Sequence, residues 1–129
     1  MKLLLDTHSL LWTLDDSRLE LSAKEIEVIN EPTNIVYVSI ASLWEIAIKA
    51  GLGKLKIPDS FFRDIPTLGF ELLSIGLDHL EAYRSLALLH RDPFDRILIA
   101  QAQVEKLTLI THDDEILQYN VDIFPRDKA

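Results

Sequence analysis

The residues with the clearest potential for chemistry in this sequence are four acids, Asp6, Glu45, Asp95 and Asp113. Each lies at or soon after a point where a predicted strand gives way to a helix, or where a helix begins. If the strands form one parallel sheet, these acids meet in the crevice at its carboxyl edge. Clustered carboxylates repel one another unless a cation lies among them, and their oxygens are the ligands that Mg²⁺ prefers. The pattern therefore predicts metal-dependent chemistry on a phosphate ester.

Strand-like and helix-like segments alternate along the chain. The sequence predicts strands over residues 2–5, 35–38, 70–74, 107–110 and 121–124. It predicts helices over 8–14, 22–30, 58–68, 78–89, 92–106 and 114–119, and one from Ser39 or Ser42 to about 51–53. This alternation is typical of an α/β fold whose mostly parallel sheet is covered on both faces.

Glu45 lies in a predicted helix that is apolar on nearly every side. The polar residues Ser42, Glu45 and Lys49 are three and four positions apart and so form one stripe. That stripe is either a narrow solvent face carrying a Glu45–Lys49 ion pair or the wall of a pocket. The apolar surroundings are compatible with both interpretations.

The three aspartates also have ordinary structural interpretations. Asp6 and Asp113 follow strands and can cap the next helix. Asp92 and Pro93 form a strong helix start, which explains Asp92 fully and places Asp95 in the first turn. The acids become persuasive as a catalytic group only when all four are considered together.

Composition limits the class of protein. The 129 residues are 48% hydrophobic and contain no cysteine, which fits a single folded domain over residues 1–129 in a reducing cytoplasm. No apolar run approaches the roughly 20 residues of a membrane span, and Asp6 comes too early for a signal peptide. The net charge of −8 argues against a protein that coats nucleic acid, but it is compatible with a nuclease or with a basic partner.

Four segments of the chain together resemble the PIN-domain ribonucleases, and more closely the VapC-type toxins of toxin–antitoxin pairs. They read LLDTH at 4–8, SIASLWEIAIK at 39–49, DPFDRILIAQA at 92–102 and LITHD at 109–113. The likeness spans nearly the whole chain in the order of the family. The segment around Asp95 is the most specific of the four.

The resemblance implies a small three-layer α/β/α sandwich in which Asp6, Glu45, Asp95 and Asp113 are the metal-binding and catalytic carboxylates. Thr7 and Thr111 would line that site. The implied activity is Mg²⁺- or Mn²⁺-dependent endoribonuclease cleavage by a metal-activated water. The family is usually dimeric, and a cognate antitoxin inhibits it by placing its tail in the active groove.

Further residues are candidates for contact with an RNA substrate. Cations near the acids could bind phosphate, and three histidines beside the acids could bind phosphate or protonate a leaving group. These candidates are His8, Lys49, Lys54, Lys56, His90, Arg91, Arg96 and His112. For each of them, a solvated or structural role is the more common one. Trp12 and Trp44 are expected in the core or in a dimer contact.

Two other functions fit parts of the pattern. A catalytically silent PIN-like binding module would keep the fold, although the complete set of acids argues against it. A phosphoacceptor receiver domain has a similar length and an acidic metal pocket. It would need an acid pair after the first strand and a lysine after a late strand, whereas Asp6 is single and no lysine follows strand 107–110 until residue 128.

Overall fold

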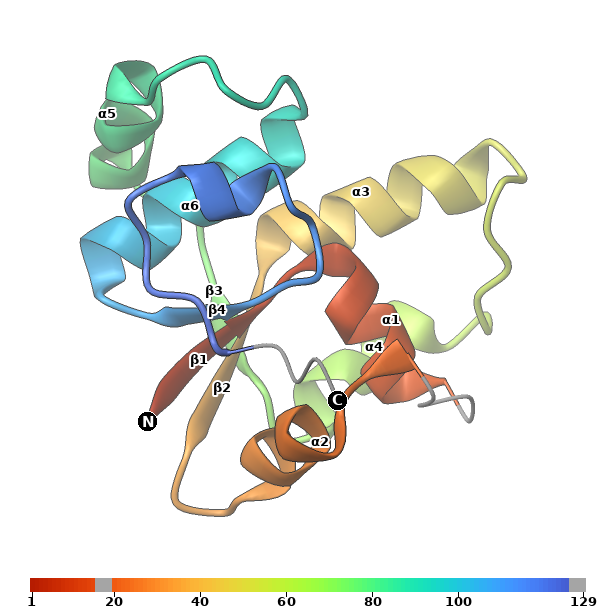
Figure 1. Cartoon of the computed structure of the whole chain (residues 1–129). Coiled ribbons are helices and arrows are strands. Elements are labelled where there is room, and N and C mark those ends of the chain that lie inside the picture. Colours follow the sequence, from red (N-terminus) through yellow and green to blue (C-terminus); the bar gives the residue numbers. More distant parts are fainter. Residues whose placement is uncertain (16–19, 126–129) are drawn as a thin grey trace.

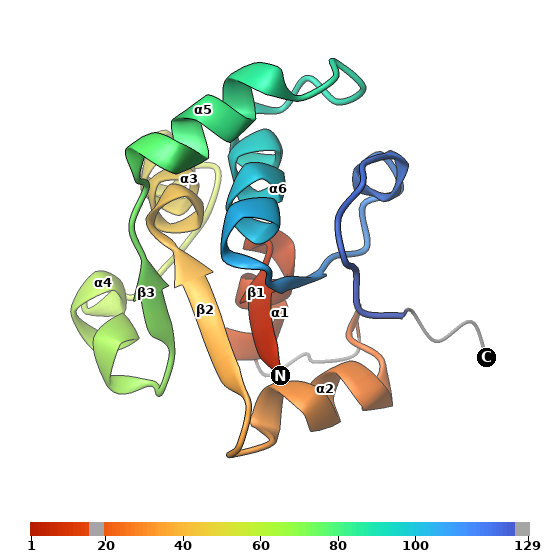
Figure 2. The same cartoon turned by 90° about the vertical axis from the view of Figure 1, so that its left-hand side faces the viewer.

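The computed structural model describes residues 1–15 and 20–125, and a four-stranded sheet in the order β3-β2-β1-β4 forms its centre (Figure 1). The strands are β1 (Lys2–Leu5), β2 (Ile35–Ser39), β3 (Glu71–Leu73) and β4 (Thr108–Ile110). All three pairings are parallel, and Leu4 of β1 lies opposite both Tyr37 and Leu109. Parallel strands end at the same edge of the sheet, which Figure 2 shows as the edge near α3 and α6.

Helices cover both faces of this sheet, which confirms the expected three-layer α/β/α sandwich. They are α1 (Thr7–Leu14), α2 (Ala23–Asn30), α3 (Ile40–Gly51), α4 (Phe61–Asp64), α5 (Leu77–Ser85) and α6 (Pro93–Glu105), with 3₁₀ helices η2 (Ile65–Thr67) and η3 (Ile116–Gln118). Within the described ranges, no helix is both long enough and apolar enough to cross a bilayer.

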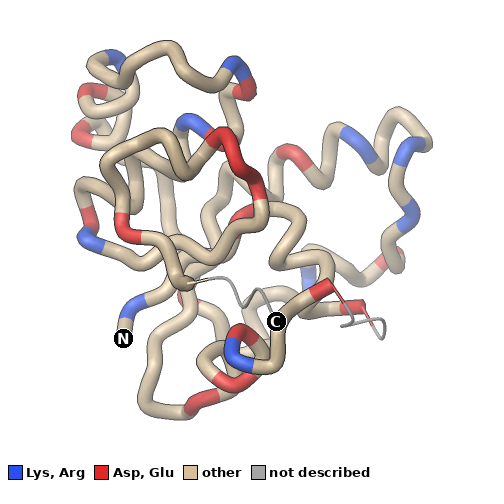
Figure 3. The backbone as a smooth tube through the Cα atoms, in the orientation of Figure 1, with Lys and Arg blue, Asp and Glu red and all other residues tan. Residues whose placement is uncertain are grey.

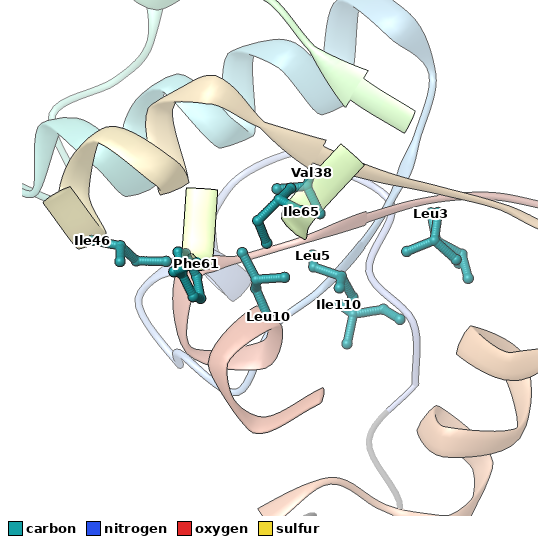
Figure 4. Close-up of a cluster of buried hydrophobic side chains, with 9 residues drawn as sticks. Leu3, Leu5, Leu10, Val38, Ile46, Phe61, Ile65 and Ile110 are labelled. Carbon is teal, nitrogen blue, oxygen red and sulfur yellow. The ribbon is translucent and has the colours of Figure 1, made fainter. Parts of the chain in front are cut away.

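Two apolar clusters pack on opposite faces of the sheet, because side chains alternate along a strand. Leu3 and Leu5 of β1 join Leu10 of α1 and residues of α3 and α4 on one face (Figure 4). Leu4 faces the other way and packs with α6, in particular with Leu98. These leucines are at most 1% exposed, and burying each stabilises the fold by about 1.5–3 kcal/mol.

Local sequence signals explain where the helices near the site begin. Ser39, rather than Ser42, caps α3, because its Oγ accepts from the backbone N–H of Ala41 at 3.0 Å. Asp92 caps α6 as predicted, accepting from the N–H of Phe94 at 2.8 Å, and Pro93 occupies the first helical position. These caps fix the directions in which α3 and α6 leave the carboxyl edge of the sheet.

The predicted strand at 121–124 is wrong. The described segment makes only one isolated parallel bridge, between Leu109 and Ile123. Around that bridge, the Leu109 N–H donates to the Asp122 carbonyl at 2.8 Å and the Phe124 N–H donates to the Leu109 carbonyl at 2.9 Å. The apolar residues that suggested a strand, Val121 and Ile123, pack against the core instead.

Three predicted helices are shorter than their sequence pattern suggests. The predicted 78–89 helix is α5 and ends at Ser85, the 58–68 segment contains α4 followed by η2, and the 114–119 segment contains only η3. The consequence for the site is that residues 86–92 form a loop leading into α6.

Candidate functional site

His90, Asp95 and Asp113 meet at the carboxyl edge of the sheet. The Nε2 atom of His90 lies 2.9 Å from Oδ2 of Asp95 and 3.1 Å from Oδ2 of Asp113. Its Nδ1 atom lies 2.9 Å from Oε2 of Glu115. One imidazole ring therefore joins three acids from the start of α6 and the turn after β4.

The two aspartates reach this point because of the elements that carry them. Asp95 lies in the first turn of α6, so its side chain projects from the amino end of the helix. Asp113 closes a tight turn after β4, in which its N–H donates to Thr111 Oγ1 at 3.1 Å and its Oδ1 accepts from the Glu115 N–H at 2.9 Å. This turn leaves Oδ2 of Asp113 facing His90.

Asp6 combines the structural role and the site role considered from sequence. It caps α1, since its Oδ1 accepts from the N–H of Ser9 at 2.8 Å. Its side chain is buried, with the residue only 4% exposed, and its negative charge acts on Asp95. Asp6 therefore belongs to the same acidic crevice.

Glu45 faces the site rather than open solvent, although it also forms the expected pair with Lys49. The residue is 8% exposed, and its Oε1 accepts from the Thr7 hydroxyl at 2.6 Å. Its Oε2 lies 3.0 Å from Lys49 Nζ. Because Thr7 follows Asp6 directly, this hydrogen bond ties the α3 carboxylate to the end of β1.

The crevice concentrates negative charge from several elements, and Figure 3 shows acidic segments in α3 and after β4 near the ends of the strands. Burial raises the pKa of the Asp95 carboxyl to about 7, with further contributions from the charges of Asp92 and Asp6. Burial alone would lower the pKa of His90, but the hydrogen bonds to Asp113 and Asp95 and the negative charges of both aspartates together outweigh that effect, and the pKa is raised. Part of the rise in the pKa values of Asp95 and His90 therefore comes from the surrounding negative charge, which favours bound protons. The same negative charge would attract a metal cation.

The donor set fits a divalent cation. One ligand atom from each of His90, Asp95 and Asp113 lies within 4.8 Å of the other two. The carboxylate oxygens suit Mg²⁺ or Mn²⁺, whereas an imidazole nitrogen is a ligand more typical of transition metals such as Zn²⁺. Asp6 and Glu45 are outside this closest group but belong to the crevice. A second group with the same residue types, Asp78, His79 and Glu105, lies at α5 and α6.

Of the residues expected to contact substrate, some are exposed and others are buried. Thr111 is buried at 1% exposure, and its hydroxyl oxygen supports the Asp113 turn. His8 and the Lys49 side chain are exposed, the latter to 42%. Arg96 is only 7% exposed, and its Nη1 donates to the Ala87 carbonyl at 2.9 Å. We therefore leave Arg96 out of the proposed phosphate contacts.

The remaining histidine and the two tryptophans lie around the site. His112 Nε2 lies 2.8 Å from Oε1 of the fully buried Glu25. Trp12 is half-buried between His8 and His112, with ring centroids 5.8 and 5.2 Å away. Trp44 is 60% exposed and contacts Phe94 edge-on, so it is a surface residue and not a core residue.

Sequence reasoning did not identify His90 as the residue that joins the acids, and it gave Glu115 no part in the site. The only available signal was the position of His90 just ahead of the Asp92–Asp95 segment. The contact with Glu115 depends on the turn after β4, which no local pattern specifies.

Comparison with known proteins agrees with this architecture. A family model described as PIN domain matches residues 3–122, whereas curated protein sequences gave no match. The fold is similar to VapBC2 from Rickettsia felis bound to a promoter DNA fragment, with a TM-score of 0.74, 18% identity, and coverage of 98% of this chain and 100% of that one.

Two further solved structures have similar folds. A toxin–antitoxin complex from Klebsiella pneumoniae has a TM-score of 0.66 and 20% identity, with 95% of each chain covered. FitAcB from Neisseria gonorrhoeae has a TM-score of 0.61 and 19% identity, covering 95% of this chain and 96% of that chain. At these identities the likeness shows the fold.

Proposed function

Because the chain belongs to the PIN domain family, we propose that it is a Mg²⁺- or Mn²⁺-dependent endoribonuclease and the toxin of a type II toxin–antitoxin pair. The observation that carries the proposal is the convergence of His90, Asp95 and Asp113 at the carboxyl edge of the sheet, with Asp6 and Glu45 in the same crevice. The whole chain acts as one nuclease domain in the cytoplasm, where RNA and antitoxin are found.

Asp95 and Asp113 would hold the metal, with His90 beside them and Asp6 adding negative charge behind Asp95. The bound ion would supply an acidic coordinated water and stabilise charge on the phosphoryl oxygens. Thr7 and Lys49 each hold one oxygen of Glu45, so the Glu45 carboxylate is fixed before substrate arrives. Such preorganisation lowers the cost of reaching the transition state.

Three lysines offer phosphate contacts along one path from the site. Figure 3 shows basic segments at the carboxyl end of α3 and in the loop that follows it. Lys49 belongs to this part of α3, and the exposed Lys54 and Lys56 belong to the loop. We propose that they guide the RNA backbone toward the acids, which would otherwise repel it.

The neutralising partner is a cognate antitoxin with a basic segment. Two of the similar structures named above are described as VapBC2 and as a toxin–antitoxin complex. The net charge of −8 favours a basic segment of that partner. Co-purification with the neighbouring gene product, and loss of RNA cleavage in the complex, would support this assignment.

A second copy of the chain is the proposed partner for an apolar surface formed by α3, α5 and α6. Trp44 and Leu80 are 60% and 49% exposed there, and they line an apolar pocket of about 230 Å³ with Phe94. Trp44→Glu should shift a dimer to monomer in analytical ultracentrifugation. A wild-type monomer at micromolar concentration would contradict the dimer.

The direct test is cleavage of structured RNAs by antitoxin-free protein with Mg²⁺, Mn²⁺ or EDTA. We expect metal-dependent cleavage in which water attacks the phosphorus and the 3′-oxygen leaves, which gives the 5′-phosphate and 3′-hydroxyl that the family resemblance implies. A single 2′-deoxy substitution at the cleaved position should not block the reaction. A requirement for the 2′-hydroxyl would contradict the mechanism, and folded protein that neither binds metal nor cleaves RNA would indicate a silent binding module.

Asp95→Asn and Asp92→Asn form a matched pair for this assay. Both remove one negative charge at the start of α6, but asparagine retains the capping function of residue 92. Asp95→Asn should reduce cleavage by more than about 100-fold, since even the loss of residues that support metal ligands costs about 10- to 100-fold. Asp92→Asn should cost less than about tenfold. Equal activity of the two variants would contradict the assignment of Asp95.

A further inference from the structure

The Tyr119 hydroxyl lies behind the site and binds the loop that carries His90. It accepts from the backbone N–H groups of Leu89 and His90 at 3.0 and 2.9 Å, and it donates to the Ala87 carbonyl at 2.7 Å. Tyr119 follows η3 and is only 8% exposed. A single hydroxyl group therefore supplies three hydrogen bonds to residues 87–90.

Arg96 joins the same network from α6. Its Nη1 donates to the Ala87 carbonyl at 2.9 Å, to Tyr119 Oη at 3.1 Å and to the His90 carbonyl at 3.4 Å. Its guanidinium group lies 4.9 Å from the centroid of the Tyr83 ring. Backbone carbonyls, a hydroxyl and an aromatic face surround this guanidinium, and these contacts offset part of the cost of burying its charge.

The network, which we call the Tyr119–Arg96 clamp, connects the segments that carry the site residues. Arg96 is next to Asp95 on α6, and Tyr119 lies at the end of the segment that begins with Asp113. Between these two elements, the clamp holds the loop from which His90 reaches both aspartates. The relative positions of all three ligand atoms thus depend on contacts made at a buried point behind them.

We propose that Tyr119 and Arg96 are positioning residues, which hold the 87–90 segment between α6 and η3 and thereby place His90 between Asp95 and Asp113. The proposal extends the proposed function in that it concerns the same metal centre. Under this proposal, Arg96 of the 92–102 segment positions a loop and does not bind substrate phosphate. Neither residue touches the reacting atoms.

Tyr119→Phe tests the proposal because it keeps the buried ring and removes only the oxygen. Tyr37→Phe, at a half-buried position of β2, is the matched control. We expect Tyr119→Phe to weaken Mn²⁺ binding in calorimetry by about tenfold, as loss of outer partners of a metal site does. It should lower kcat on RNA with KM within about twofold, since an aligned site affects the chemical step more than substrate binding.

The position of the His90 ring gives a readout that a purely stabilising role would not move. The ¹⁵N and ¹H signals of this imidazole, recorded in metal-free protein, should shift in Tyr119→Phe and stay unchanged in Tyr37→Phe. A folded Tyr119→Phe variant with unchanged His90 signals and wild-type Mn²⁺ affinity would overturn the proposal.

These readouts separate the clamp from the proposed activity. If wild-type protein binds Mn²⁺ but cleaves no RNA, the proposed function fails, and affinity together with the His90 signals still decides the clamp. If wild-type protein binds no Mn²⁺, the His90 signals alone decide it, and unchanged signals overturn the proposal.

Arg96→Lys completes a double-mutant cycle. Lysine keeps the positive charge but lacks the planar fork of donors, so it should weaken Mn²⁺ binding in the same direction as Tyr119→Phe. Because both changes disable one clamp, their effects should not add. The Mn²⁺ affinity of the double variant should lie within about twofold of that of the more affected single variant. Effects that multiply fully would show that the two residues act independently and would overturn a shared clamp.

Discussion

Two histidine–carboxylate clusters have the residue types of a metal site, but the hydrogen bonds of their imidazole rings differ. In the α5–α6 cluster, Nδ1 of His79 accepts from the Gly76 N–H at 2.9 Å. The ring proton is therefore on Nε2, which lies 2.7 Å from Glu105 Oε2 and donates to it. In the site cluster, by contrast, both ring nitrogens of His90 face carboxylates.

The two clusters also lie in different parts of the fold. His79 is 3% exposed and connects the start of α5 to the end of α6, which is a structural tie between two packed helices. His90 lies where the strands end, beside three acids from the start of α6 and the turn after β4. Residue types and proximity alone do not identify a metal site; the position of the cluster in the crevice beyond the strand ends does.

The largest expected effect separates the clusters by metal binding. Asp95→Asn should abolish the tightest Mn²⁺ site in calorimetry, because it removes a ligand from the crevice. Glu105→Gln should leave affinity and stoichiometry unchanged within about twofold. Retention of Mn²⁺ binding by Asp95→Asn, together with its loss in Glu105→Gln, would exchange the roles of the two clusters.

Replacing each histidine by phenylalanine should affect different properties: the free energy of unfolding for His79 and the Mn²⁺ affinity for His90. His79→Phe leaves the Gly76 N–H without its acceptor, so the free energy of unfolding should fall by about 1–3 kcal/mol. Its Mn²⁺ affinity should remain that of the wild type. His90→Phe should instead weaken Mn²⁺ binding by about tenfold or more. Urea denaturation and calorimetry on both variants distinguish these outcomes, and identical profiles would remove the distinction between the clusters.

The charge of the site should make the metal-free protein less stable as pH rises. The pKa of Asp95 is raised to about 7 in the folded state, so between pH 4 and 7 the folded state binds more protons than the unfolded chain. The pKa of His90 is also raised, and its contribution is likewise lost as pH rises through the folded value.

In EDTA, the melting temperature should therefore fall between pH 5.5 and 8 by about 5 °C, the scale of a 1 kcal/mol change in a domain of this size. Asp95→Asn should flatten this dependence, whereas Glu105→Gln should retain it. Added Mn²⁺ should stabilise the wild type more at pH 8 than at pH 5.5. A slope that Asp95→Asn leaves intact would assign the effect to other groups.

The smallest expected effect concerns the Thr7–Glu45 hydrogen bond in the site. Thr7→Val removes the hydroxyl with little change in shape, and one neutral hydrogen-bond partner is worth about 1 kcal/mol. Cleavage should slow by about three- to tenfold with the fold intact. Thr13→Val, which removes a hydroxyl that donates to the Ser9 carbonyl in α1, is the control. Equal rates for the two variants would deny Thr7 a part in the site.

Much of the fold could be predicted because its signals are local. Continuous apolar residues in β1 indicate a strand buried on both faces, and the Ser22–Glu25 and Asp92–Pro93 pairs mark helix starts that the structure confirms. The polar stripe of α3 showed that Glu45 could face a pocket. The burial of that stripe at Ser42 and Glu45 identifies which of the two interpretations applies.

Other parts of the site depend on contacts between distant residues, which sequence patterns do not encode. Arg96 resembled a surface phosphate ligand until its contacts with Tyr119 and Ala87 placed it in the interior. His90 reaches the acids because α5 ends at Ser85 and the loop that follows brings this residue to the turn after β4. The apolar residues at 121–124 satisfy a strand pattern but form a single isolated bridge to β4, between Ile123 and Leu109.

The central claim is that the His90–Asp95–Asp113 cluster binds the catalytic metal. Anomalous diffraction from crystals soaked in Mn²⁺ tests it most directly, because it locates the ion without relying on activity. We predict the strongest peak within coordination distance of both Asp95 and Asp113. A strongest peak at Asp78 and Glu105, or no peak near Asp95 at a Mn²⁺ concentration that supports cleavage, would contradict the account.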